Sequence, residues 1–370
     1  MFMQNEVDTK KIESTTQTSC EEPKICSVGG QALMEGIMML GPHGMCQVVR
    51  DPQGKMVVTT KPVEMLTRKY KILGLPMIRG VVSLVDSLRR GMKALFDSAE
   101  IAMTEEEKAE EEANKSKFDK WIDKKLGDKA MNFFMGISLV LAILMSVGLF
   151  FFLPLLVSDL VVPEGTPIIW ERVVEGLTRM VIFFGYMVAI TVMKDIRRVY
   201  MYHGAEHKTI SCFEKGLPLT VENVRTCSKH HPRCGTAFMF VVIFISILVT
   251  SVVPKIPIAN PVLNFLANLG IRFLLLPFIA GIAYEFNRFV GKHDNVVTRI
   301  LRAPGMGMQH FTTIEPDDSM IEVAIVALGK ALVYEGIEVD ISAYEPKPET
   351  SEVSETSEPE DALPEEGADV

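Results

Sequence analysis

The stretch MNFFMGISLVLAILMSVGLFFFLPLLV, residues 131–157, carries no charged side chain over 27 positions. A bilayer core about 30 Å thick needs roughly 20 apolar helical residues, so this stretch can cross it even with Pro154 near its end. Because a charged residue inside hydrocarbon is costly, an uncharged run of this length is typical of a transmembrane helix. The stretch therefore predicts an integral membrane protein.

Three further segments are apolar enough to be spans. They lie at residues 173–193, 236–253 and 261–284, which brings the expected number of transmembrane helices to about four. The second contains Glu175 and Arg179, and the fourth contains Arg272. Charges inside a membrane are functional candidates by default, but each arginine lies only part of the way in from the same side. We expect both side chains to extend to that interface, where their guanidinium groups stay hydrated.

The short loops predict the orientation. Residues 158–172 and 254–268 carry one basic residue each, whereas residues 194–235 carry eight. Loops rich in lysine and arginine stay on the cytoplasmic side of a membrane. This places the 194–235 loop in the cytoplasm and, with four spans, both termini as well.

The net charge of −9 comes from one end of the chain. Residues 345–370 hold ten acidic residues, one basic residue and few large apolar side chains, so we expect a disordered acidic tail. The polar segment 1–24 is expected to be a disordered lead-in, and residues 103–130 an acidic linker or helix. No long basic stripe with interleaved aromatic residues occurs, which argues against a nucleic-acid partner. The expected partner is the lipid bilayer, and the oligomeric state stays open.

Residues 25–102 predict a small cytoplasmic N-terminal domain. Residues 45–50 and 55–60 read as two strands joined by Asp51-Pro52-Gln53-Gly54, whose residues suit a type I turn, so a β-hairpin is expected. From Pro76 to Ala102 the apolar residues recur at steps of three and four, which predicts an amphipathic helix with a basic opposite face. Such a helix can lie on an anionic leaflet or pack on a neighbouring domain.

The region after the fourth span, residues 285–344, is expected in the cytoplasm. It begins with basic residues that mark a cytoplasmic edge. Residues 317–334 then predict one more amphipathic helix, because Asp317, Asp318 and Ser319 form a start signal ahead of a periodic apolar face.

The loop at residues 194–235 is unusual in composition, since it holds four of the seven histidines and three of the six cysteines. If residues 202–212 are helical, His203 and His207 lie one turn apart on the same face, with Glu206 beside them. This is the order of an H-x-x-E-H metal site. Imidazole and thiolate are ligands that zinc prefers, and cytoplasmic cysteines seldom form stable disulfides. The loop predicts a divalent metal, with zinc as the candidate, at the membrane edge.

A third metal ligand has to come from elsewhere in the chain. The candidates are His231, Cys234, His230, Cys227 and the carboxylate of Glu35. Three protein ligands plus water would make a catalytic site with Glu206 as the general base, whereas a fourth protein ligand would close a structural site. The alternative to a metal is that these imidazoles bind lipid headgroups or neighbouring carboxylates.

Two features of the segment before the hairpin need explanation. Glu35 stands among apolar residues, where a carboxylate is costly unless it meets a cation, and a salt bridge with Arg79 is the alternative to metal ligation. Gly29 and Gly30 precede it. We expect a tight turn there, although a glycine pair can also let the backbone approach a phosphate.

Several strings in the chain resemble the YqhQ family of bacterial membrane proteins. They are VGGQALMEGIMM at 28–39, YHGAEHKT at 202–209, HPRCGT at 231–236, and Pro304 with TTIEPD at 312–317. The resemblance covers about residues 25–335. It implies a bacterial inner-membrane setting and a family of unknown biochemical function labelled as predicted metal-dependent enzymes, but it supplies no substrate or reaction.

Together these features predict a mainly α, polytopic membrane protein with a hairpin-containing cytoplasmic domain and amphipathic helices. The leading hypothesis is a metal-dependent hydrolase that acts on a lipid-linked or membrane-adjacent substrate at the cytoplasmic membrane edge. The alternative is a transporter component or membrane scaffold, in which the histidines serve structure or metal sensing. A transport path would require Arg179, Arg272 and Glu285 to face one cavity.

Overall fold

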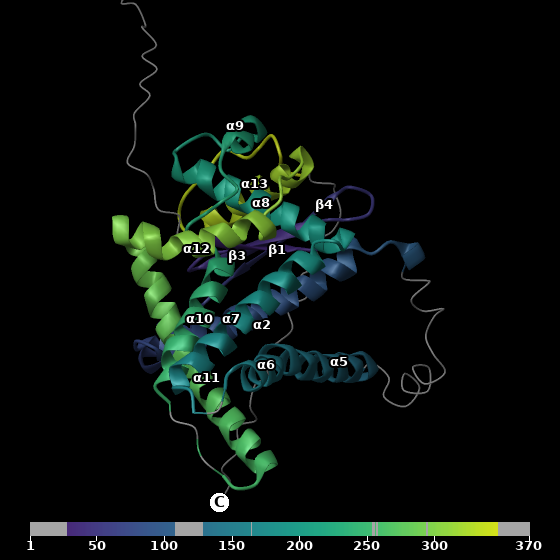
Figure 1. Cartoon of the computed structure of the whole chain (residues 1–370). Helices are drawn as coiled ribbons and strands as arrows, with labels where there is room; N and C mark the ends of the chain where they lie inside the picture. The colour runs from purple at the N-terminus through teal and green to yellow at the C-terminus, as the bar shows by residue number, and fades with distance from the viewer. Residues whose placement is uncertain are drawn as a thin grey trace, which may run out of the picture.

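The computed structural model describes residues 28–107, 129–163, 165–253, 256, 258–293 and 295–346 (Figure 1). Within these ranges the chain is mainly helical, with one antiparallel sheet near its N-terminal end. The expected lead-in at 1–24, with Cys20 and Cys26, lies outside the described residues. The same is true of residues 108–128 of the expected linker and of the acidic tail from residue 347.

The predicted hairpin forms part of a four-stranded antiparallel sheet. Its strands are β1 (Gly29–Leu33), β2 (Gly36–Leu40), β3 (Gly44–Arg50) and β4 (Met56–Pro62), in the order β1-β2-β3-β4. β3 and β4 are the expected pair, with Arg50 opposite Met56 across the turn. The first hairpin turns tightly through Met34 and Glu35, and Glu35 takes a positive φ of 48°. The expected turn at Gly29-Gly30 was wrong, because both residues lie in β1.

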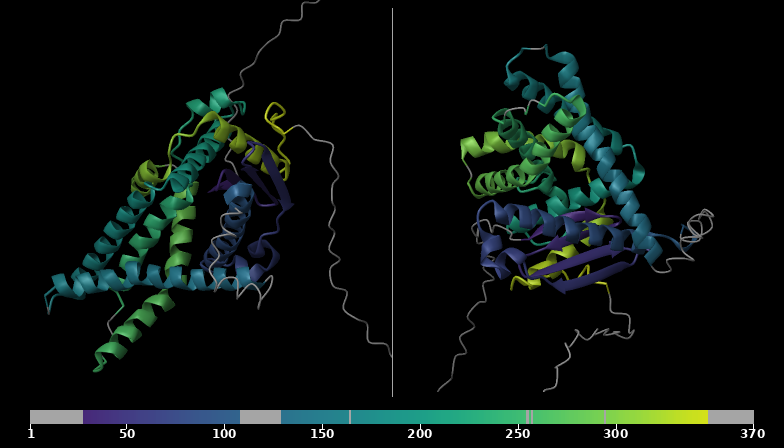
Figure 2. Two further views of the ribbon diagram at one scale, coloured as in Figure 1. Left: turned by 90° about the vertical axis from the view of Figure 1, so that its right-hand side faces the viewer. Right: turned by 90° about the horizontal axis from the view of Figure 1, so that it is seen from below.

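Helices cover both faces of this sheet (Figures 1 and 2). On one face lie α8 (Lys194–Glu214) and α13 (Asp318–Val333), with the short α9 (Val221–Thr226) beside them. On the other face lies α2 (Ile78–Ala102), whose Ala94 packs against side chains of the sheet. In the chain, α2 follows two short helices, α1 (Leu66–Lys69) and η1 (Lys71–Gly74). The predicted helix from Pro76 is confirmed, but it packs on the sheet through small residues such as Ala94 and Ser98. Most of the predicted apolar stripe, such as Val85 and Leu88, is exposed, so its partner stays open.

The C-terminal helix α13 is more deeply buried than an amphipathic helix. Asp317 caps it, since its carboxylate accepts a hydrogen bond from the Met320 amide at 3.0 Å. Eleven of its 16 residues are buried, between the sheet and α8. It therefore forms the centre of the main hydrophobic core.

The apolar segments form helices, of which the first runs crosswise to the others (Figure 2). They are α5 (Lys129–Val147), continued by the π-helical turn η2 (Gly148–Phe152) and α6 (Leu153–Val161), then α7 (Ile168–Ile190), α10 (Gly235–Ser251) and α11 (Pro261–Lys292). Three stretches are long and apolar enough to cross a membrane: 136–161, 168–190 and 262–292. The third expected span is a shorter helix of 17 residues. α11 runs on beyond the expected end at residue 284.

Among the charged residues of the apolar helices, Arg172, Glu175 and Arg272 are buried and Arg179 is half-buried. Arg272 binds Glu175 through both guanidinium nitrogens, with N–O distances of 2.8 Å, and Arg172 adds a contact at 3.2 Å. Arg179 donates to the carbonyl oxygen of Phe150 at 2.9 Å. Arg179 and Arg272 therefore bind partners on neighbouring turns and helices. Their extension to the membrane edge stays a prediction.

A further helix, α12 (Val296–Thr312), completes the fold. It packs on α10 and brings its C-terminal end to α8. The link is tight: the Ile314 amide donates to the carbonyl of Tyr200 at 2.9 Å, and Gly204 lies so close to the carbonyl of Ile314 that a Cβ there would meet it at 2.0 Å. Gly204 is therefore required by a close approach of backbone.

Candidate metal centre

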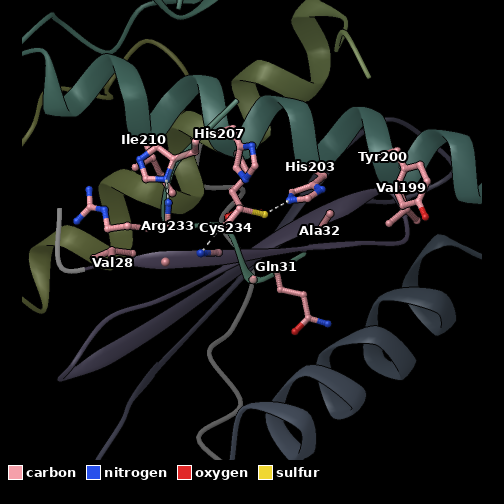
Figure 3. A pocket seen from close by; sticks show the side chains of 15 residues that line it. Val28, Gln31, Ala32, Val199, Tyr200, His203, His207, Ile210, Arg233 and Cys234 are labelled. Carbon is pink, nitrogen blue, oxygen red and sulfur yellow. Dashed lines mark hydrogen bonds between the residues drawn. The ribbon is translucent and has the colours of Figure 1, made fainter. Parts of the chain in front are cut away.

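The centre is built on α8, which follows α7 after residues 191–193. Because the predicted helix over 202–212 forms, His203 and His207 lie one turn apart, and their ring centroids are 4.4 Å from each other. His207 is 1% exposed, whereas His203 is half-buried. Both rings face the loop that leads into α10 (Figure 3).

Backbone carbonyls fix the protonation of both rings. The Nδ1 of His203 lies 2.8 Å from the carbonyl oxygen of Thr312, and the Nδ1 of His207 lies 2.7 Å from that of Lys229. A carbonyl oxygen can only accept a hydrogen bond, so each Nδ1 carries the proton and each Nε2 keeps its lone pair. Metal-binding histidines are commonly oriented in this way.

Cys234 brings a third donor atom to the same point. Cys234 is the residue just before α10 begins, and its Sγ lies 3.3 Å from the Nε2 of His203. One donor atom from each of His203, His207 and Cys234 lies within 4.8 Å of the other two. Figure 3 shows the thiol of Cys234 directed at His203, below α8.

This spacing fits zinc. With Zn–N and Zn–S bonds of about 2.0 and 2.3 Å at a tetrahedral angle, a ligating nitrogen and sulfur lie about 3.5 Å apart. The observed separation of 3.3 Å between His203 and Cys234 is close to that value. Burial lowers the pKa of His207 below its usual 6.5, so the ring stays neutral near pH 7 and can act as a ligand. Two imidazoles and one thiolate would leave a coordination position for water.

Glu206 lies next to this group, three residues after His203 on α8. It is 5% exposed, and burial raises the pKa of its carboxyl, against the opposing pull of His203, His231 and the Gly30 amide. The amide of Gly30, in β1, donates to Oε1 of Glu206 at 3.1 Å. A Cβ on Gly30 would lie 2.6 Å from Cδ of Glu206, so only glycine allows this approach.

His231 lies beside the three donors without joining them. Its ring centroid is 5.8 Å from that of His207, and its Nε2 lies 3.1 Å from the carboxylate of Glu214. Its backbone is fixed by Gln309, which is fully buried and exchanges two hydrogen bonds of 2.8 Å with it. His231 therefore holds the loop and orients Glu214, and the four-ligand structural site is not assembled in this arrangement.

Glu35 is not at the centre either. Its carboxylate forms a two-point ion pair with Arg198, one N–O distance being 2.6 Å, and accepts a hydrogen bond from Tyr202 at 3.3 Å. The expectation that Glu35 meets the metal group is not supported by this placement, because Arg198 satisfies the charge first. The cation is also not Arg79, which binds Glu285 at 2.6 Å.

A cavity of about 550 Å³ opens beside the three donors. Its walls come from β1, from α8 and from the loop before α10. His203, Glu206, His207 and Cys234 all line it. In Figure 3, Tyr200 lies at the end of the cavity near His203, and Arg233 lies toward the opposite end. A small molecule can therefore reach the donors and the buried carboxyl together.

Comparison with known proteins identifies the family. Residues 75–334 match the profile described as "Protein of unknown function (DUF1385)". The chain belongs to this DUF1385 family. It is also 30% identical, over 313 residues, to the "Uncharacterized protein YqhQ" of Bacillus subtilis (strain 168), covering 84% of this chain and 93% of that protein. No solved structure matches. The resemblance noted from the sequence is confirmed.

Some residues that build the centre in this DUF1385 member were not predicted. Gly30 holds the carboxyl of Glu206 and Thr312 holds the ring of His203, whereas Glu214 and Gln309 hold His231 beside them. The signals were weak but present: Gly30 belongs to a glycine pair, and Thr312 opens one of the strings that resemble the family. Glu214 and Gln309 act through contacts between distant segments, which a single sequence does not reveal.

Proposed function

We propose that the protein is a metal-dependent hydrolase whose site lies at the cytoplasmic edge of a bacterial inner membrane, with both termini in the cytoplasm. The observation that carries this proposal is the convergence of donor atoms from His203, His207 and Cys234 within 4.8 Å, beside a cavity that also reaches Glu206. The substrate is a lipid-linked or membrane-adjacent molecule, because α8 follows directly from the apolar helix α7.

Each residue has a defined role in this proposal. His203, His207 and Cys234 are the ligands, with the two imidazoles held by carbonyls. A zinc ion, when bound, supplies a polarised water of lowered pKa. Glu206 would act as the general base toward a water in the site, and burial raises the pKa of its carboxyl. The Gly30 amide fixes the orientation of the carboxyl.

The transporter alternative has less support. It requires Arg179, Arg272 and Glu285 to face one cavity, but the three have separate surroundings. Arg179 lines an apolar cavity among the spans, Arg272 is bound to Glu175, and Glu285 is bound to Arg79. Because each charge already has a partner of its own, no shared polar path follows from them.

The first test is metal content. The full-length protein is purified in mild detergent without chelator, and its metal is measured by plasma mass spectrometry. We expect about one zinc per chain in the wild type, loss of it in His203→Ala, and no change in the matched control His310→Ala, whose exposed ring lies 4.5 Å from that of His230. Wild-type protein without stoichiometric metal would overturn the proposal.

The second test separates catalysis from structure. Wild type and Glu206→Gln are incubated with vesicles of total bacterial lipid extract, and the products are followed by mass spectrometry. We expect Glu206→Gln to keep its zinc and to lose turnover at least 100-fold, the range that removal of a general base produces. Equal product formation by both proteins would exclude Glu206 as the base and favour a structural or sensing site.

A further inference from the structure

A second cavity lies among the membrane helices, close to the metal centre. It has a volume of about 500 Å³, within the usual range for ligand pockets. Side chains of α7, α10, α11 and α12 line it, together with Phe150 and Phe151 of η2. Apart from Arg179, Ser246, Thr312 and the two tyrosine hydroxyls, the lining is aliphatic or aromatic. Its walls therefore suit a hydrocarbon chain.

The charged residue in this wall is already bound. Arg179 donates through Nε to the carbonyl of Phe150 at 2.9 Å and through Nη1 to the hydroxyl of Ser246 at 3.4 Å. Its guanidinium also lies 5.5 Å from the centre of the Phe151 ring. Because these contacts hold the guanidinium against the wall, the cavity does not require an anionic or strongly polar ligand.

The apolar cavity and the cavity of the metal centre share a wall residue. Tyr200 lines both, and its hydroxyl lies 3.7 Å from the sulfur of Met187 on the apolar side. Thr312 lines the apolar cavity, while its carbonyl oxygen holds the Nδ1 of His203. An apolar site and a polar site thus meet across one side chain, which matches a molecule with a polar head and a hydrocarbon tail.

We propose that the apolar cavity binds the acyl chain of a membrane lipid, and that Tyr200 separates this chain from the polar head in the metal-centre cavity. The proposal deepens the function proposed above and rests on it for the role of the head, but binding of the chain itself needs no metal. The cavity extends along α7 from Arg179 to Met187, about 12 Å of helix. The chain would therefore lie along the helices, with its end near Arg179.

Photocrosslinking tests the site directly. The full-length protein is placed in two nanodisc preparations, one of phosphatidylglycerol and one of phosphatidylethanolamine. Each contains a small fraction of its own lipid that carries a diazirine near the end of the acyl chain. Labelled peptides are mapped by mass spectrometry. The reference position is the membrane-facing Val181, which is 71% exposed and lies on the same helix as Met187. We expect the label at the cavity residues Met187 and Ile243 to be at least about fivefold higher than the label at Val181. Label at Val181 equal to or above that at cavity residues means annular lipid only and overturns the proposal.

Variants test the same point and separate it from catalysis. Ile243→Trp fills the cavity and should lower the cavity label at least about fivefold, while the outward-facing control Val181→Trp should leave it unchanged. If Ile243→Trp does not fold, the wild-type label distribution still decides. Glu206→Gln should keep the full label while losing turnover. Label retained in protein that holds no zinc would refute the hydrolase and leave lipid binding standing, whereas zinc and turnover without cavity label would do the reverse. The relative label from the two lipids identifies the headgroup.

Discussion

Among the apolar helices, Glu175 binds Arg272 and Arg172, so that opposite charges face one another. On α8 and just before α10, the donor atoms of His203, His207 and Cys234 instead lie within 4.8 Å of one another. The first group brings charges of opposite sign together, whereas the second brings together atoms that can each donate an electron pair to a cation. Burying polar atoms is costly unless each finds a partner.

The difference separates structural burial from a binding site. In the cluster around Glu175, one carboxylate meets two guanidinium groups, and the buried Nε of Arg172 has no hydrogen-bond partner among the described residues. The three donors on α8 and at Cys234 instead form a group that a cation would fit. The two regions should therefore respond differently to mutation, metal and pH.

The largest effect is expected from removing the carboxylate of Glu175. Glu175→Ala would leave Arg272 and Arg172 buried without their carboxylate, which typically costs about 3–5 kcal/mol. The free energy of unfolding, measured by denaturant titration in detergent micelles, should fall by that amount. The exposed pair between Arg225 and Asp318 supplies the control, because Asp318→Asn should cost at most about 1 kcal/mol. If Glu175→Ala lowers the free energy of unfolding no more than the control does, the carboxylate of Glu175 does not stabilise the two buried arginines.

The next largest effect is expected from adding zinc. Free zinc at about 100 times its dissociation constant should stabilise the chelator-treated protein by about 2.7 kcal/mol, since only the folded state holds the three donors together. The increase is measured as a shift of the thermal midpoint. It should disappear in Cys234→Ser and persist in His310→Ala. An equal shift in Cys234→Ser would mean that zinc binds elsewhere.

A smaller effect is expected from disturbing the buried carboxyl. Gly30→Ala places a methyl group 2.6 Å from Cδ of Glu206, and such overpacking costs about 1–3 kcal/mol. It should also reduce turnover by displacing the base. Gly29→Ala is the matched control, because a Cβ there meets nothing within 4 Å. Both variants are compared by thermal midpoint and by product formation, and equal behaviour would argue against a close approach at Gly30.

The most gradual effect is expected from pH. Burial lowers the pKa of His207 and His231 below 6.5, so the unfolded chain binds more protons and stability should fall as the pH drops from about 6.5 through the folded pKa values. Burial raises the pKa of Glu206, which acts in the opposite sense, because the folded state then favours the protonated carboxyl as the pH falls. Thermal midpoints of chelator-treated protein between pH 7.5 and 5 check this. Glu206→Gln should make the decline steeper, and an unchanged slope would contradict the assignment.

Much of the fold was predictable from local sequence patterns. The turn at Asp51–Gly54, the apolar steps after Pro76 and the cap at Asp317 each lie within a few residues of the element they define, and these elements form as expected. β2 escaped prediction because four of its five residues are buried, so its sequence shows no alternation. α12 contains Pro304, Gly305 and Gly307, which read as helix breakers although the helix continues through them.

The candidate site was predictable only in part. The spacing of His203 and His207 and their place beside Cys234 followed from the helix and from the short loop before α10. The roles of Glu35 and His231 depend instead on Arg198 and Glu214, whose positions are set by packing between distant segments. Whether the three donors hold a metal stays a prediction.

The burial of α13 against the sheet has a consequence for biosynthesis. β3 ends at Arg50, but the helix that covers its apolar face begins only at Asp318. At about 5–20 residues per second, a ribosome needs roughly 15–50 s to pass from one to the other. During that time the apolar helices have to enter the membrane, and the apolar face of β3 is not yet covered by α13. A nascent chain of this protein is therefore a strong candidate client for a chaperone that shields β-sheet surfaces until translation is complete.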